Sequence, residues 1–91
     1  MQAPARAKSG EVVSVALQLE GPQLGDAHAF RVQMFDMEGK ELPMLTRNLG
    51  APRGTCSWEV PLAVDLKKGT YSLRVHEIAT GVRAERSLQV W

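Results

Sequence analysis

Most of this 91-residue chain alternates apolar and polar residues in the way that a β-strand requires. The clearest example is EVVSVALQLE, residues 11–20. Successive side chains of a strand point to opposite faces, so an apolar residue at every second position predicts a strand with one buried face. The β-branched valines lack helical spacing, which disfavours a helix over the same residues. The residues predicted to face inward are Val13, Val15, Leu17 and Leu19.

Five further segments carry strand signals, and turn-forming residues separate them. They are residues 28–35, 41–49, 55–62, 70–77 and 82–90. Short strands at this spacing, with no convincing helix, predict an all-β sandwich or barrel. Parallel α/β folds are excluded because their crossovers need helices. The inward-facing residues predicted in these segments are Phe30, Val32, Met34, Cys56, Trp58, Val60, Leu62, Tyr71, Leu73, Val75, Val82, Ala84, Leu88 and Val90.

Turn chemistry sets the boundaries of the segments. Asp36 suits the first position of a type I turn, and Gly39 suits the left-handed position that closes it. Pro43 has no N–H for a strand ladder, so residues 41–49 are expected to form an edge strand or an irregular segment. Further turns or loops are expected at residues 50–54, 65–69 and 78–81.

The length of the chain predicts one domain. Residues 10–91 would form it, while residues 1–9, MQAPARAKS, are expected to be a linker that carries an expression start. On this interpretation the chain is an excised piece of a longer protein. Cys56 is the only cysteine, so no disulfide can form within the chain and the apolar core must stabilise the domain.

Charge and hydropathy exclude several classes of partner. The chain has 11 Lys and Arg against 10 Asp and Glu, and its longest basic run is Lys67-Lys68. A nucleic-acid surface needs a basic stripe to neutralise phosphates, and an anionic membrane needs a basic cluster, so neither partner is expected. No apolar run approaches the length of a membrane span, so no membrane insertion is expected. The first residues also lack the apolar region of a signal peptide.

Leu66, Gly69 and Tyr71 form the pattern L-x-x-G-x-Y at the start of the segment 70–77. This pattern resembles the tyrosine corner of immunoglobulin-like and fibronectin type III sandwiches, in which the tyrosine hydroxyl bonds to the backbone a few residues upstream. Trp58 is the large core residue expected in the preceding strand. The resemblance implies an immunoglobulin-like antiparallel β-sandwich of about seven strands. A Cys…Trp…Cys framework is missing, so the chain is not an antibody-type domain.

The same ending also resembles sandwich modules appended to large extracellular bacterial proteins, including glycoside-hydrolase-like enzymes, and macroglobulin-type domains. The resemblance implies a non-catalytic accessory, spacer or docking module of a secreted or cell-surface protein. Its partners would be neighbouring domains of the same chain. The alternatives are a carbohydrate-binding module, which would bind polysaccharide, and a macroglobulin-like interaction domain. Such sandwiches host many roles, so fold alone does not choose among these functions.

Candidate catalytic and zinc-binding residues are few. His28 and His76 are the only histidines, and both are expected to lie at the surface without the three or four ligands that zinc needs. Cys56 shares a face with Trp58, which predicts a buried and unreactive thiol. No serine lies in a G-x-S-x-G elbow. No catalytic residue is therefore predicted.

Acidic residues near the predicted loops could offer oxygens to calcium. Calcium takes six to eight oxygens, and no complete cage is visible in the sequence. Asp36 is better explained as a turn cap, and the other carboxylates as solvated groups. The acidic residues concerned are Asp26, Asp36, Glu38 and Glu41. No metal and no cofactor is predicted.

Two of the five aromatic residues fall out of phase with their buried neighbours, and these are Phe35 and Trp91. Exposed rings can stack on sugars, but exposed apolar groups at the end of a module also mark contacts with another domain. The second interpretation is preferred, so Phe35 and Trp91 are the predicted interface residues. Cross-strand ion pairs are expected between the outward arginines and glutamates that also lie in strands. The arginines are Arg31, Arg74, Arg83 and Arg86, and the glutamates are Glu59, Glu77 and Glu85.

Overall fold

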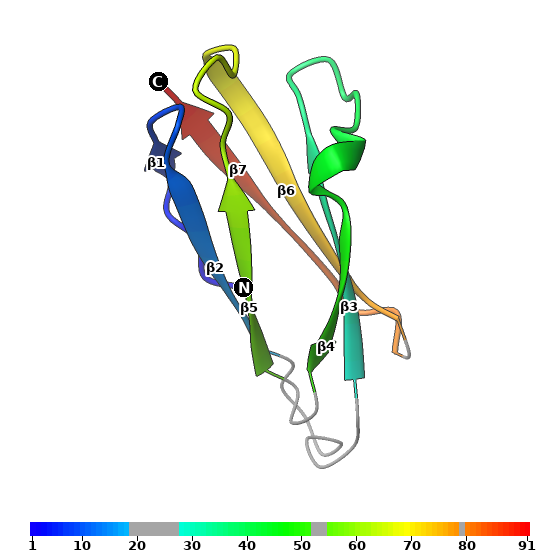
Figure 1. The fold of residues 1–91 in the computed structure, drawn as a ribbon. Coiled ribbons are helices and arrows are strands. Elements are labelled where there is room, and N and C mark those ends of the chain that lie inside the picture. Colours follow the sequence, from blue (N-terminus) through cyan, green and yellow to red (C-terminus); the bar gives the residue numbers. More distant parts are fainter. Residues whose placement is uncertain (19–27, 52–54, 79) are drawn as a thin grey trace.

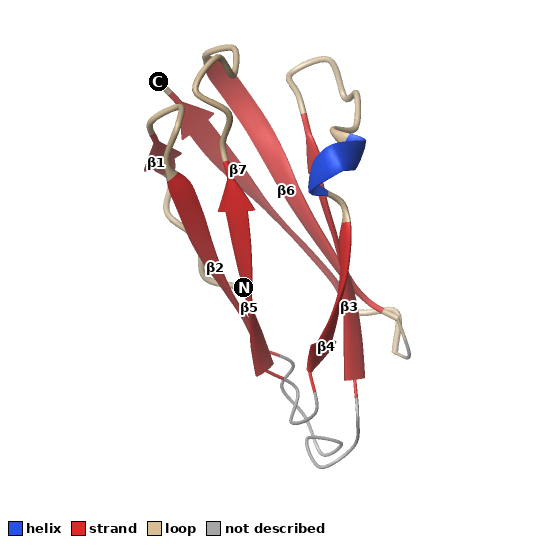
Figure 2. Cartoon of the chain, in the orientation of Figure 1, coloured by secondary structure: helices blue, strands red, loops and turns tan. Residues whose placement is uncertain are grey.

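The computed structural model of the protein describes residues 1–18, 28–51, 55–78 and 80–91. Within these ranges all regular structure is strand except for one short 3-10 helix (Figures 1 and 2). The expected all-β fold is therefore confirmed. The elements are β1 (Arg6–Ala7), β2 (Val12–Gln18), β3 (His28–Phe35), η1 (Pro43–Leu45), β4 (Arg47–Ala51), β5 (Thr55–Pro61), β6 (Gly69–Glu77) and β7 (Arg83–Val90).

These strands form two sheets. One has five strands in the order β1-β7-β6-β3-β4, and the other consists of β2 and β5. Neighbouring strands run antiparallel except β1 and β7, which run parallel. The chain crosses between the sheets repeatedly, and Figure 1 shows the β2-β5 pair as a separate layer from the larger sheet.

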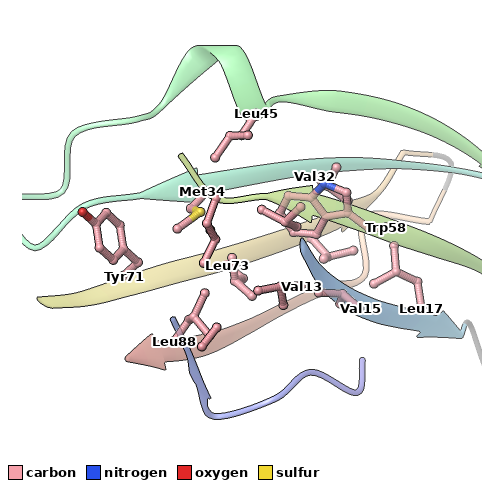
Figure 3. Packing of buried hydrophobic residues seen from close by; sticks show 14 of the residues in the cluster. Val13, Val15, Leu17, Val32, Met34, Leu45, Trp58, Tyr71, Leu73 and Leu88 are labelled. Carbon is pink, nitrogen blue, oxygen red and sulfur yellow. The ribbon is translucent and has the colours of Figure 1, made fainter. Parts of the chain in front are cut away.

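The buried side chains of both sheets form one apolar cluster (Figure 3). Trp58 is 2 % exposed and contributes the largest side chain. The inward phase predicted for β2, β3 and β6 is confirmed wherever the structure describes those strands. The cluster includes Val13, Val15, Leu17, Phe30, Val32, Met34, Trp58, Val60, Leu62, Tyr71, Leu73, Val75, Leu88 and Val90.

Four predicted core positions differ from the structure or lie outside it. Ala84, the second residue of β7, is only half-buried. Val82 is 53 % exposed, because the turn that contains Gly81 extends through it and β7 begins only at Arg83. Cys56 is half-buried rather than buried, because it lies close to the end of the two-stranded sheet. Leu19 lies outside the described residues.

The first nine residues contribute to the sheets, which differs from the expected linker. Arg6 and Ala7 pair with Gln89 and Val90, and Ala7 is buried. Gln2 exchanges two backbone hydrogen bonds of 2.8 Å with Ala16 of β2. A two-residue strand carries no alternation, so its pairing depends on the neighbouring strand and could not be predicted from its own residues.

The turn chemistry is largely as expected. The Oδ1 atom of Asp36 accepts hydrogen bonds from two backbone N–H groups, and Gly39 has a φ of 78° in the left-handed region. Pro43 begins η1, and β4 follows at the edge of the five-stranded sheet, as the missing N–H predicted. Residues 50 and 51 were expected in a loop but end β4, and residues 52–54 lie outside the described part of the chain.

Candidate functional site

The expected corner residues lie at the start of β6. The Tyr71 hydroxyl donates a hydrogen bond of 2.6 Å to the carbonyl oxygen of Lys67, four residues upstream. Gly69 has a φ of 152°, and a Cβ atom there would lie 2.6 Å from the side chain of Met37. Leu66 packs partly buried against the core. Burial, and secondarily the charge of Asp36, raise the pKa of Tyr71, so its hydroxyl keeps the proton that it donates.

A groove of about 450 Å³ opens beside this corner. The turn after β3, helix η1 and the segment after β5 line it, and Tyr71 closes one side. Its lining is mainly apolar, and Met37 and Met44, which belong to it, are 55 % and 72 % exposed. Its charged residues are Asp36, Glu38, Asp65 and Lys67, so acidic groups prevail around an apolar floor.

The two aromatic residues predicted as interface groups, Phe35 and Trp91, differ in exposure and in the cations near their rings. Trp91 is 50 % exposed, and its ring centre lies 5.9 Å from the Arg6 guanidinium and 5.8 Å from the Lys8 ammonium. Phe35 is half-buried, and the guanidinium of Arg74 lies over its ring at 4.1 Å. Trp91 therefore keeps half of its surface exposed beside two cations, whereas Arg74 lies close over one face of the half-buried Phe35.

His28 is a correction to the predicted surface position. It is 7 % exposed, and its Nδ1 atom lies 2.9 Å from Oε1 of Glu77, which is fully buried. The backbone N–H of Thr80 also donates to Glu77 at 3.3 Å. The alternation of the strands indicated these buried positions, because His28 is in phase with the buried Phe30 and Glu77 is in phase with the buried Tyr71. His28 was assigned to the surface by residue type, and that assignment was wrong.

The expected ion pairing is confirmed for one arginine only. Arg74 pairs with Glu85 at 2.6 Å across β6 and β7. Arg31 and Arg83 have no carboxylate within salt-bridge distance among the residues that the structure describes. Arg86 is opposite Leu73 and therefore belongs to the inward phase of β7, although its side chain is exposed. The prediction was wrong because charge type does not reveal which strands become neighbours.

Hydrogen bonding and burial shift the pKa values of two other side chains, Glu59 and Cys56. The Ser14 hydroxyl and, to a smaller extent, the Ser57 hydroxyl lower the pKa of the exposed Glu59 carboxyl by donating to it. Burial raises the pKa of the Cys56 thiol, which disfavours the thiolate needed for nucleophilic attack.

Within the described ranges, no group of three or more His, Cys, Asp or Glu side chains could hold a metal ion. Of the acidic residues considered for calcium, Asp36 accepts backbone N–H groups and Glu41 accepts from Gln33 and Thr46. Asp26 lies outside the described residues. No helix in the described part of the chain is long and apolar enough to cross a membrane.

No protein-family model matches the chain, and a search of curated proteins found no match either.

Proposed function

We propose that the chain is an immunoglobulin-like β-sandwich that acts as a non-catalytic docking module of a larger, secreted or cell-surface protein. In immunoglobulin-type sandwiches the second and fifth main strands face a sheet built from the third, sixth and seventh. Here β2 and β5 form one sheet, and β3, β6 and β7 are adjacent in the other. The Tyr71 hydrogen bond to Lys67 also supports this assignment.

The observation that carries the docking role is the apolar groove beside Tyr71. Met37 and Met44 both line the groove, and each exposes more than half of its surface. Methionine side chains adapt to different partners, and clustered exposed apolar groups mark interaction surfaces. We infer that a neighbouring domain of the same protein inserts an apolar side chain into the groove. The acidic rim favours a partner with lysine or arginine beside that side chain.

The docking test uses this domain and the neighbouring domain of the same protein as separate molecules in titration calorimetry. The double variant Met37→Ser and Met44→Ser should weaken binding about tenfold or more, because hot-spot contacts are concentrated in few apolar side chains. The matched control is Ile78→Ser with Val82→Ser, which changes two apolar residues of similar exposure away from the groove. Equal weakening by both pairs, or binding unaffected by the first, would refute docking at the groove.

A carbohydrate-binding module is the second candidate, and the half-exposed indole of Trp91 favours it. Its stacking would be tested by titrating neutral polysaccharides into the protein and into Trp91→Ala. Saturable binding that this substitution abolishes would favour sugar recognition by Trp91. Unchanged or absent binding would reject this candidate.

A further inference from the structure

Three basic side chains lie in one row on the outer face of the five-stranded sheet. Arg31 of β3 is directly opposite His76 of β6, and His76 is directly opposite Arg83 of β7. Asn48 of β4 extends the row and accepts a hydrogen bond of 3.3 Å from Arg31. Side chains opposite each other on one face have Cβ atoms about 4.5–5.5 Å apart. Two guanidinium groups and an imidazole therefore lie within reach of a single anionic ligand.

The charge of this row is not compensated by the sheet. Opposite charges that face each other across neighbouring strands stabilise a sheet, and this row has no such acidic partner among the residues that the structure describes. The next row shows the usual arrangement, because Arg74 is opposite Glu85 and pairs with it at 2.6 Å. In the described residues neither Arg31 nor Arg83 has such an acidic partner. A bound anion would supply the missing charge, and guanidinium groups bind carboxylate and sulfate with two parallel hydrogen bonds.

The surroundings of the row suit an extended ligand. A shallow depression of about 460 Å³ runs along β6 and β7 and is lined by Arg74, His76, Arg83 and Glu85. Further along the same face, Phe35, Ser72 and Ser87 form another row across the strands. The face therefore presents two guanidinium groups without a carboxylate partner among the described residues, with hydroxyl groups and a partly exposed ring two rows away, on an open surface rather than in an enclosed pocket.

We propose that this face binds an acidic polysaccharide, with a carboxylate or sulfate group held between Arg31, His76 and Arg83. A sugar chain carries its polar groups on ring substituents, which side chains on a sheet face can reach. An extended peptide would instead add to a sheet edge, where backbone hydrogen bonds are available, and the row is on the face. Single-stranded nucleic acid would need free stacking platforms, and Arg74 covers one face of Phe35. This surface is independent of the docking groove.

The test is titration calorimetry of the 91-residue protein with polygalacturonate, with dextran sulfate and with neutral dextran. Binding to at least one acidic polymer and none to neutral dextran is expected. The double variant Arg31→Gln and Arg83→Gln should weaken this binding about tenfold, which corresponds to about 1.4 kcal/mol. A matched control, Lys40→Gln with Lys68→Gln, removes the same charge from exposed turns and should leave the affinity within about twofold, since exposed charges far from a site are screened.

The thermal unfolding midpoint of each variant verifies that it folds. The first double variant should lose little stability, because neither arginine has a carboxylate partner among the described residues. Backbone amide NMR shifts on adding galacturonate oligomers should map to residues 31, 76 and 83. Equal weakening by both double variants would show diffuse charge attraction and overturn the proposal. Absence of binding to both acidic polymers, or equally tight binding of polyglutamate or single-stranded DNA, would also overturn it.

Discussion

At the scale of single residues, the same residue type has different roles according to where the neighbouring strands place it. Glu77 and Glu85 both lie in strands and both pair across a strand boundary. Glu77 is fully buried against His28, while the side chain of Glu85 keeps 56 % of its surface exposed. Burial removes the screening by water, so the two carboxylates should contribute differently to stability.

Glu77→Ala should destabilise the protein by about 3–5 kcal/mol, because it leaves the buried imidazole of His28 without this carboxylate. Glu85→Ala removes an exposed partner of Arg74 and should destabilise by only about 0.2–1 kcal/mol. The urea midpoints of the two variants measure the difference. Equal losses would contradict the buried position of Glu77.

Tyr71→Phe should destabilise the protein by about 1–3 kcal/mol, because the Lys67 carbonyl loses its donor in a partly buried corner. The ring and its packing are retained, so only the hydroxyl is tested. Chemical denaturation compares the variant with the unaltered protein. An unchanged midpoint would remove Tyr71 from the corner that supports the immunoglobulin-like assignment.

At the scale of elements, the start of a strand can require a positive φ angle, which residues with a Cβ atom rarely adopt. Gly69 begins β6 with a positive φ and lies against Met37, whereas Gly50 lies in β4 with open space around it. Glycine is therefore required at the first position and replaceable at the second.

Gly69→Ala should destabilise the protein by about 1–3 kcal/mol through backbone strain, since the flexible end of Met37 can move away from the added methyl group. Gly50→Ala should change the stability by no more than about 0.5 kcal/mol. Thermal unfolding of both variants tests this. A larger effect at Gly50 would refute the assignment of strain to the start of β6.

Strand β1 is the element that the sequence pattern did not predict. Removal of residues 1–8 should destabilise the protein by about 2 kcal/mol or more, because the backbone N–H groups of Gln89 and Trp91 lose their acceptors and Ala7 leaves the core. Removal of residues 1–4 breaks the Gln2 pairing but retains β1, so its effect should be smaller. Equal stability of the shorter and full-length proteins would show that the segment is a linker after all.

At the scale of the whole molecule, one apolar cluster joins the two sheets. The described residues of neither sheet form a second apolar cluster, and a two-stranded sheet by itself is at best marginally stable in water. Loss of either sheet exposes the side chains of the other, so the described strands should unfold together.

The variant Trp91→Phe leaves Trp58, between the sheets, as the only tryptophan. Its fluorescence and the far-ultraviolet circular dichroism should then give the same urea midpoint, as a two-state transition requires. Separate midpoints would show that the β2-β5 pair unfolds independently of the larger sheet.

Local information was enough to predict much of this fold. The alternation at Val13 and Val15, and again at Tyr71 and Leu73, predicted strands and their buried faces, because side-chain direction in a strand follows from the backbone alone. Asp36 and the left-handed glycine after it predicted their turn for the same local reason.

Pairing between distant strands was decided only by the tertiary structure. The contact between His28 and Glu77 joins residues 49 positions apart, and the row of Arg31, His76 and Arg83 exists only because β3, β6 and β7 pair in one register. A shift of one residue in either pairing would turn the side chains to opposite faces and separate the row. The sequence by itself therefore determined which residues are buried in most strands. The tertiary structure alone decided which polar and charged residues meet, because register is a property of pairs of strands.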